Sequence, residues 1–334
     1  LTATDVPLDN TLREAIGQLN PKTGNVWESL QPQGTLDRLT IQLRSPGSNG
    51  KPEVAIQGQK WPRRMYAPDP GLLVKPRWLP YRVDHVTGMF NYRNGQVALT
   101  GLRGQHGKTV IRLDGTCFFP MEGPWDAKLT NLTIDHLRAD HELLTALPLP
   151  IRKAVEKLNI TGPLMLRGQL QLAKAMEGDR KLNAQWDLNI TAAGATLDSG
   201  VRLDHIHGGV RLFGLYDKDG FRSRGRIDID SLFFRKEQLT NLSGPLWIDP
   251  RQVLFGVWSQ HQVETEKPQS ITAKSMGGRV VLDAQVLTGT DARFFLQAAL
   301  QQGDLAYILN QRGVDAKVTG KADATLQLSG RTSG

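Results

Sequence analysis

Residues 221–230 have the sequence FRSRGRIDID, in which apolar and charged side chains alternate. Successive residues of a β-strand point to opposite faces, so Phe221, Ile227 and Ile229 share one face. The arginines and aspartates of the same stretch fall on the other face. The pattern predicts a strand with one apolar and one polar face.

The same alternation recurs in stretches that exceed the usual strand length of about five to six residues. Four examples are TLDRLTIQLR at 35–44, TVIRLDGTCFF at 109–119, GPLMLRGQLQLA at 162–173 and DAKVTGKADATLQLS at 315–329. The dipeptides Asn94-Gly95 and Asp219-Gly220 are typical of tight hairpins. We therefore expect a mainly β fold of long antiparallel strands.

Helical patterns are short and few, at 7–19, 140–158 and 303–313, and prolines divide the second one into two pieces. Each is followed by a glycine and an alternating strand, at Gly34, Gly162 and Gly320. This order predicts a repeat of about 130 to 160 residues that is stacked along one apolar surface. The predicted units are a first repeat at 1–127, a second at 128–290 with its helical insert at about 140–158, and the start of a third at 291–334.

Two further stretches resemble each other, RVDHVTGMF at 82–90 and RLDHIHGGV at 202–210. The neighbouring Asp and His of one strand point to opposite faces and cannot share a metal ion. His205 and His207 could share a face, but the counterpart of His207 in the first stretch is Thr87. We expect no metal site, and we expect His85 and His205 to be equivalent positions of a structural repeat.

No motif of the chain predicts catalysis or a cofactor. The stretch GLRGQHGKTV at 101–110 misses the phosphate-binding loop by one residue, because Leu102 stands where the first glycine is needed. No serine lies in a nucleophile elbow, and the single Cys117 excludes an internal disulfide. The sequence therefore predicts a protein that is not an enzyme.

The net charge of +8 favours anionic partners. Basic and aromatic residues are interleaved at 60–82, a pattern that suits phosphate head groups at a membrane interface and also single-stranded nucleic acid. The candidates for binding a head group or an anionic surface are Arg63, Arg64, Lys75 and Arg77. The alternative is a proline-rich crossover whose aromatic side chains pack on a sheet edge.

No apolar run approaches the roughly 20 residues that span a bilayer, and the first residues lack the pattern of a signal peptide. We expect a segment of a longer protein whose anchor lies outside this chain.

Taken in order, several phrases resemble the AsmA-like superfamily. They are VPLDNTLREAI (6–16), VTGMFNYRNGQVALTGLRGQHGKTVIRLDGT (86–116), LTALPLPIRKAVEKLNITGPLMLRGQLQL (144–172), VRLDHIHGGVRL (201–212), LTNLSGPLWI (239–248) and DLAYILNQRGVDAKVTGKADATLQLSG (304–330). The resemblance implies a periplasmic segment of a protein anchored in the inner membrane of double-membraned bacteria. It also implies an elongated, curved, groove-like sheet that serves phospholipid movement toward the outer membrane or outer-membrane homeostasis.

On this reading the partner is phospholipid or another acyl lipid, with membrane surfaces and envelope proteins at the ends and no nucleic acid. Acyl chains would lie along the apolar sheet face, without a cofactor or catalytic group. The candidate groove-lining residues are Ile111, Leu113, Leu164, Leu166, Leu170, Leu172, Ile227, Ile229, Val318, Leu326 and Leu328.

Two alternatives stay open. The same alternation would fill the core of a closed β sandwich or solenoid, a scaffold that assists envelope assembly by binding other proteins at exposed strand edges. The second alternative is an enzyme that acts on envelope glycans or lipids.

Overall fold

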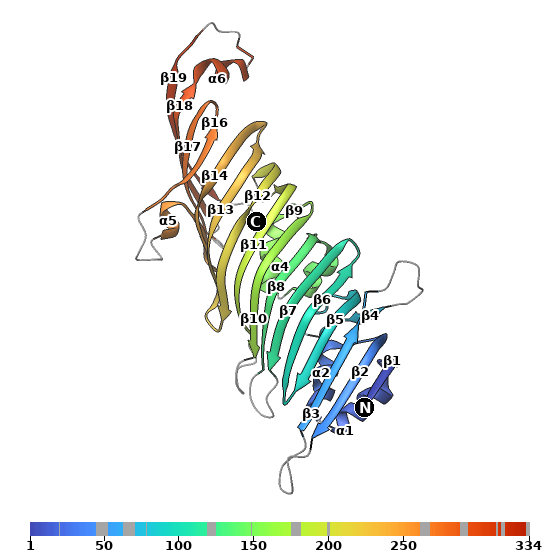
Figure 1. Cartoon of the computed structure of the whole chain (residues 1–334). Coiled ribbons are helices and arrows are strands. Elements are labelled where there is room, and N and C mark those ends of the chain that lie inside the picture. The colour runs from blue at the N-terminus through green and yellow to red at the C-terminus, as the bar shows by residue number, and fades with distance from the viewer. Residues whose placement is uncertain are drawn as a thin grey trace. The chain divides into compact units, whose positions relative to one another are not determined.

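The structure is a computed structural model that describes residues 1–19, 21–44, 53–62, 71–77, 79–118, 125–147, 149–174, 182–198, 201–260, 268–287, 293–311, 313–314 and 318–331. Within these residues the chain forms 19 strands and six helices, and the strands are hydrogen-bonded into one sheet (Figure 1). The predicted fold, mainly β with long antiparallel strands and a few short helices, is confirmed.

The chain divides into two compact units. Unit 1 comprises Leu1–Ala154 and Met165–Ala184, and unit 2 comprises Val155–Leu164 and Gln185–Gly334. The repeats at 1–127, 128–290 and 291–334 were predicted from recurring sequence, whereas the two units are defined by their compactness. The two divisions answer different questions, and the repeats stay a prediction.

In unit 1, strands that follow one another in the chain mostly pair with one another, all antiparallel. Its elements are β1 (Thr2–Pro7), α1 (Asn10–Leu19), α2 (Pro21–Leu30), β2 (Thr35–Arg44), β3 (Glu53–Lys60), β4 (Leu72–Val74), β5 (Val83–Arg93), β6 (Gln96–His106), β7 (Thr109–Phe118), β8 (Asp126–Leu137), α3 (His141–Ala146) and most of β10 (Leu164–Lys174).

In unit 2 the long strands β12, β13 and β14 lie side by side (Figure 1). The elements of this unit are β9 (Ile160–Thr161), β12 (Arg202–Asp217), β13 (Gly220–Phe234), β14 (Glu237–Ile248), β15 (Gln252–Phe255), α5 (Val257–Gln260), β16 (Ile271–Ser275), β17 (Gly278–Leu287), β18 (Arg293–Asp304), α6 (Leu305–Gln311) and β19 (Lys321–Arg331). Both α4 (Leu149–Leu158) and β11 (Leu182–Asp198) contribute residues to each unit.

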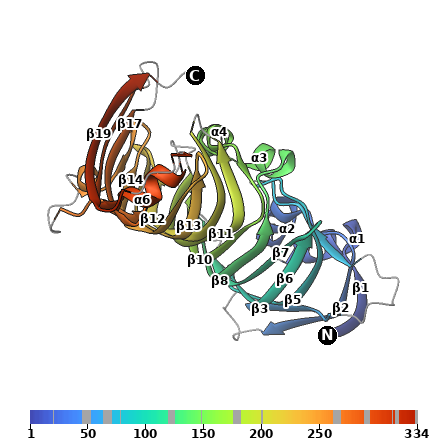
Figure 2. The ribbon, with the colours of Figure 1, turned by 90° about the horizontal axis from the view of Figure 1, so that it is seen from above.

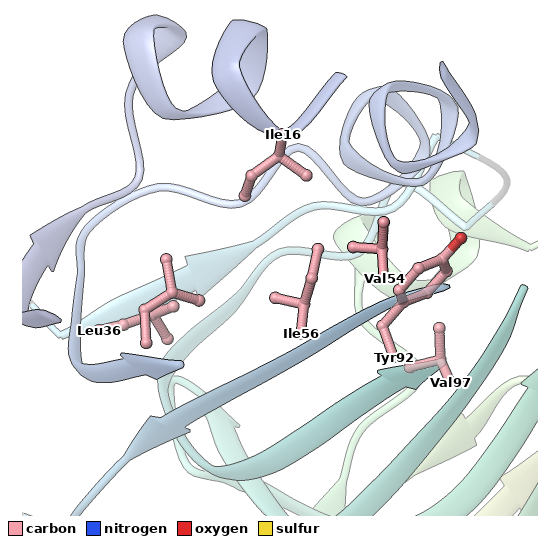
Figure 3. Close-up of a cluster of buried hydrophobic side chains, with 7 residues drawn as sticks. Ile16, Leu36, Val54, Ile56, Tyr92 and Val97 are labelled. Atoms are coloured by element: carbon pink, nitrogen blue, oxygen red, sulfur yellow. The ribbon is translucent and has the colours of Figure 1, made fainter. Parts of the chain in front are cut away.

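The principal apolar core of unit 1 lies between the sheet and helices α1 and α2. Figure 3 shows Ile16 of α1 pointing toward Leu36 and Ile56 of the strands, and these side chains are buried with Val54, Tyr92 and Val97. Trp27 of α2 packs against the same cluster. In Figure 2 the strands β5, β6 and β7 arch beneath α2. Part of one face of this sheet is therefore covered by these helices.

Three helices begin in the same way. The carboxylates of Asp9, Asp140 and Asp304 each accept a hydrogen bond from a backbone N–H three residues further on, at 2.9, 2.9 and 3.1 Å. An aspartate at this position supplies a partner for an N–H group that the helix leaves unpaired. The helices α1, α3 and α6 therefore share the same arrangement at their N-termini.

The strands on either side of these helices are also arranged in the same way. β1 pairs with β2, β8 with β10, and β18 with β19, so each helical segment is inserted between two neighbouring strands. The glycines that precede the second strand, Gly34, Gly162 and Gly320, all have positive φ, at 112°, 101° and 149°. A residue with a side chain rarely adopts this conformation, so glycine ends each connection.

The two Asp-His stretches have the same local geometry. His85 and His205 take left-handed conformations, with φ of 50° and 52°, at places where the strand pairing shifts register. Gly88 and Gly208 follow with φ of 124° and 122°. The backbones of neighbouring strands approach so closely that a Cβ atom would lie 2.8 and 2.6 Å from a carbonyl oxygen. The predicted equivalence of His85 and His205 is confirmed at the level of backbone conformation.

Side-chain contacts repeat as well. The guanidinium Nε of Arg82 donates to Asp84 at 2.8 Å, and that of Arg202 donates to Asp204 at 3.0 Å. The aspartates therefore pair with arginine, which leaves no reason to assign them to a metal ion.

Several predicted elements have nearly the expected bounds, but the strand predicted at 315–329 begins at Lys321. Helices α2 and α5 were not predicted. The hairpin at Asn94-Gly95 is confirmed by positive φ at both residues, 50° and 85°. The second hairpin is also confirmed, although Gly220 pairs with Asp217 and already belongs to β13.

Candidate functional site

An unbroken apolar row crosses seven strands of unit 2. Cross-strand partners share a face of the sheet, so the pairing register defines each row. One such row, on β12, β13, β14, β15, β17, β18 and β19 in that order, consists of Leu212, Gly225, Leu246, Phe255, Ala284, Leu296 and Leu328. No member carries a polar side chain. We call it the central apolar row.

A second row lies two residues along each strand. Val210 pairs with Ile227 and Ile227 with Gly244, against which Ile271 of β16 packs. The row continues beyond β16 through Leu282, Ala298 and Leu326. Two adjacent rows without a charge give this face of unit 2 a continuous apolar surface.

The opposite face of the same strands, which we call the polar face because it carries the charged side chains, also includes Trp247, Leu254 and Phe295. Arg211 of β12 pairs with Arg226 of β13, and both side chains are exposed. On β17, Asp283 accepts a hydrogen bond from the backbone N–H of Val257 at 2.8 Å, which fastens the start of α5 to this polar face. Helix α5 therefore begins on the face opposite the apolar rows.

Glycines in the apolar rows are covered by side chains of neighbouring strands. A Cβ atom on Gly225 would lie 2.8 Å from Leu212 Cδ2 and 3.3 Å from Leu246 Cδ2, so both leucines lie over the glycine. Phe294 lies over Gly330 in the same way, 2.8 Å from the place of a Cβ atom. The space beside these glycines is therefore filled by large apolar side chains of the neighbouring strands.

The structure places four candidate residues of unit 2 in these two rows or next to them. Ile227 and Leu326 belong to the second row, Leu328 belongs to the central row, and Ile229 follows Ile227 on the same face. Leu326 and Leu328 are 49% and 46% exposed, whereas Ile229 is buried. The apolar face is therefore most accessible on β19.

Unit 1 has a matching apolar row, but helices α1 and α2 pack on part of it. Ile41, Ile56, Tyr92 and Val97 are cross-strand partners in sequence, and the row continues through Cys117 to Ala127. Most of this row takes part in the core beneath the helices. The structure thus places a covered apolar face in unit 1.

The remaining candidates of unit 1 and β10 are mostly half-buried. Ile111 pairs with Gly104 and Ile134, and Leu113 pairs with Leu102, all on the apolar face. Both candidates are partly exposed. Along β10 the candidate leucines are partly buried except the last, which is buried; they are Leu164, Leu166, Leu170 and Leu172.

Val318 was placed wrongly. The predicted strand at 315–329 begins only at Lys321, so Val318 is exposed and precedes β19. Gly320, with φ of 149°, separates it from the strand. The rest of the predicted alternation is confirmed, because Leu326 and Leu328 share a face.

The four basic candidates do not form a described cluster. Arg63 and Arg64 lie outside the described residues. Lys75 and Arg77 come just after β4 and lie against the end of α2, where their backbone N–H groups donate to the carbonyls of Leu30 and Ser29. The Arg77 guanidinium lies 3.8 Å from a Glu28 carboxylate oxygen, and both side chains are largely exposed.

The described part of the chain contains no group of three or more His, Cys, Asp or Glu side chains that could hold a metal ion. His205 instead contacts the Phe233 ring edge-on, with 5.9 Å between ring centroids. Among the described residues, no helix has the length and apolar composition needed to cross a membrane.

Cys117, on the apolar face of unit 1, provides a chemical probe. Burial raises the pKa of its thiol to about 11, and the negative charge of Asp126 adds to the shift. A rise from 9.0 to about 11 lowers the thiolate fraction at pH 8 about a hundredfold, while the more basic thiolate recovers about a factor of ten in reactivity. We expect alkylation by iodoacetamide at pH 8 to be about tenfold slower than in urea-unfolded protein.

The rate of this alkylation is also expected to rise about tenfold per pH unit between pH 8 and 10, because the thiol ionises only near its raised pKa. Mass spectrometry of the intact chain measures both rates. Equal rates in folded and unfolded protein at pH 8 would show that Cys117 is not held on a buried face.

Several members of the central apolar row were not predicted from the sequence. Leu212, Leu246, Phe255 and Leu296 were not among the candidates, although each lies in a stretch with apolar alternation. Alternation alone does not say which strands are neighbours, so it cannot align residues of distant segments into one row.

The chain matches no model of a known protein family, and it has no significant match among curated proteins or solved structures. Function is therefore inferred from the apolar rows and the residues around them.

Proposed function

We propose that the protein is a non-enzymatic, AsmA-like segment that holds the acyl chains of phospholipid or a similar lipid on the apolar face of its sheet. The observation that carries this proposal is the central apolar row, which crosses seven strands without a polar side chain. Its most exposed member, Leu328, lies on β19.

The size of the row suits an acyl chain. Six gaps between strands of about 4.8 Å each give a length of roughly 29 Å. The hydrocarbon of one bilayer leaflet is roughly 15 Å thick, so the row is longer than one extended chain. A lipid therefore has room to occupy more than one position along it.

The energetics suit transfer. Burying one methylene group from water is worth about 0.8 kcal/mol, so an acyl chain on the face avoids a large hydration cost. The acyl chain is equally well solvated in a bilayer, so moving the lipid between bilayer and protein changes the free energy little. The face would hold lipid against water without trapping it, while the head group stays at the solvent edge.

The location and partners belong to the same proposal. We place the segment in the periplasm as part of a protein anchored in the inner membrane, with phospholipid as cargo and with membrane surfaces or envelope proteins at its ends. Support comes from the order of sequence phrases that resemble the AsmA-like superfamily and from the recurring order of Asp-capped helix, glycine and strand.

The test is site-specific photocrosslinking in a double-membraned bacterial host. A photoreactive amino acid at position 296 lies in the central apolar row, and one at the neighbouring exposed Gln297 lies on the polar face. We expect phospholipid adducts at 296, little adduct at 297, and phospholipid in solvent extracts of the purified protein. Absence of both adduct at 296 and extracted lipid would contradict the proposal.

A further inference from the structure

The polar face of β12 and β13 gathers three exposed arginines around one aromatic ring. Arg211 of β12 pairs directly with Arg226 of β13, and Phe213 pairs with Arg224 two residues further along the strands. The guanidinium carbon atoms of Arg211 and Arg224 lie 4.5 and 5.9 Å from the centroid of the Phe213 ring. We call these four residues the arginine platform.

The platform concentrates positive charge. Side chains directly opposite each other on antiparallel strands have Cβ atoms about 5 Å apart, and like charges in that position destabilise a sheet. Arg211 and Arg226 are in that position. Arg224 and Arg226 lie on the same face two residues apart, about 7 Å along the strand. The two guanidinium groups of β13 can therefore reach one anion between them.

Two other arginine side chains of this face, or one of the platform and its neighbour, are already paired with carboxylates. Asp187 of β11 accepts hydrogen bonds from Nε and Nη2 of Arg211, at 3.2 and 3.1 Å. Asp217 accepts a hydrogen bond of 2.6 Å from the guanidinium group of Arg222. Both carboxylates are thereby engaged, and the charges of the next two arginines on β13 stay unbalanced by them.

Arg224 and Arg226 have no such partner. Among the residues that the structure describes, no carboxylate is hydrogen-bonded to either guanidinium group. Trp247 is the cross-strand partner of Arg224, and its indole N–H donates to Asp249 at 2.8 Å, so that carboxylate is also engaged. Asp228 is exposed on the same face, two residues beyond Arg226, and offsets only part of the charge.

Unit 1 provides a comparison. Arg103 of β6 is directly opposite Arg112 of β7, and Arg112 donates a hydrogen bond of 2.6 Å to Asp135. There too, one arginine of a like-charged pair is neutralised. Arg103, however, has no second arginine two residues away on its own strand. The arginine platform differs because it offers two neighbouring guanidinium groups and an aromatic ring beside them.

Phosphate is the ligand chemistry that suits the platform. A planar guanidinium group donates two parallel N–H groups to phosphate oxygens, and the cation–π contact with Phe213 restricts Arg224 before a ligand arrives. A membrane surface suits the platform less, because Asp228 and Asp230 are exposed on the same strand and would face the anionic lipids. A small ligand can contact the two guanidinium groups alone.

We propose that Arg224 and Arg226 bind the phosphate group of a small soluble ligand on the polar face of unit 2, with Phe213 positioning Arg224. This site goes beyond the proposed lipid site and is separate from it, because it lies on the face opposite the apolar rows. A lipid whose acyl chains lie on the apolar rows has the sheet between its head group and the platform. The phosphate ligand would therefore bind independently of lipid.

The probe is inorganic pyrophosphate, titrated into the full chain at low ionic strength after lipid extraction, with isothermal titration calorimetry as the measurement. We expect a dissociation constant of about 1 mM or lower. Arg224→Gln and Arg226→Gln should each weaken binding about tenfold, since each removes a charge-assisted contact. Asp228→Asn should strengthen binding about threefold, because it removes a negative charge beside the site.

The matched control is Arg103→Gln, which removes an exposed arginine that also lies opposite another arginine. It should leave the affinity unchanged, and an equal loss in this variant would overturn the proposal, because pyrophosphate would then respond to net charge alone. No binding below about 10 mM, or unchanged binding by the double variant Arg224→Gln/Arg226→Gln, would overturn it as well.

A flotation assay with phosphatidylglycerol vesicles tests the rival source of phosphate. We expect no flotation of the lipid-free chain that depends on the platform. Flotation that is lost in the double variant would show that the platform binds a membrane surface, which contradicts a small soluble ligand. The double variant should also keep the lipid content of the unmodified protein, so the outcome is distinguishable from failure of the lipid proposal. Circular dichroism confirms that each variant is folded.

Discussion

The double variant Leu326→Asp/Leu328→Asp is expected to carry at least tenfold less phospholipid than the unmodified protein. Both leucines lie in the apolar rows of unit 2, and both are about half exposed, so their replacement should leave the fold intact. Two carboxylates on this face keep their hydration water, and an acyl chain cannot cover them without a desolvation cost of several kcal/mol. Lipid phosphorus per mole of purified protein gives the measurement.

The matched control is Thr325→Asp/Gln327→Asp on the same strand. These exposed residues alternate with the leucines and point to the polar face, so the same two charges should leave the lipid content unchanged. If the leucine variant retained its lipid, or if both variants lost it equally, acyl chains would not lie on the apolar rows. The proposed function would then be wrong in its central point.

The second large effect is expected for Asp37→Ala, which should lower the free energy of unfolding by about 3–5 kcal/mol. The Asp37 carboxylate lies 3.1 Å from Lys60 Nζ and accepts a hydrogen bond of 2.7 Å from the backbone N–H of Trp61. The two charged side chains are only 5% and 3% exposed. Removing the carboxylate leaves the ammonium group of Lys60 buried without that partner, which is costly in a poorly hydrated site. Urea denaturation followed by circular dichroism measures the loss.

Two further variants separate burial from charge pairing. Replacing both partners, as in Asp37→Leu/Lys60→Met, should recover most of the stability, because no charge then stays buried. Glu53→Ala breaks the exposed pair between Glu53 and Arg93, 3.3 Å apart, and should cost less than about 1 kcal/mol. A similar small loss for Asp37→Ala would mean that water reaches the buried pair in solution.

The strands were the most predictable part of the fold. The stretch at 35–44 is β2 with identical bounds, and that at 109–119 contains β7 at Thr109–Phe118, with residue 119 outside the described residues. In the first stretch Leu39, Ile41 and Leu43 alternate with polar residues, and in the second Ile111, Leu113 and Cys117 lie at every second or fourth position, so the local sequence indicates a strand. Helix α2 was missed although it begins with Pro21, a residue favoured in the first turn of a helix, because its apolar residues have no clear helical period.

The candidate face was predictable only in part. Alternation correctly placed Ile227 and Ile229 on one face, and likewise Leu326 and Leu328, because the face of a side chain depends on its own strand alone. That Leu246 and Leu296 belong to one row depends on pairing between distant segments. The covering of unit 1 by α1 also depends on tertiary packing, which alternation does not encode.

The position of the Asp-capped helices has a consequence for insertions. Each helix lies in an excursion between two strands that pair directly, so the backbone hydrogen bonds between those strands do not depend on the length of the excursion. Insertions are tolerated best where few backbone hydrogen bonds are affected. These excursions are therefore the places where the fold can vary in length while its sheet stays the same.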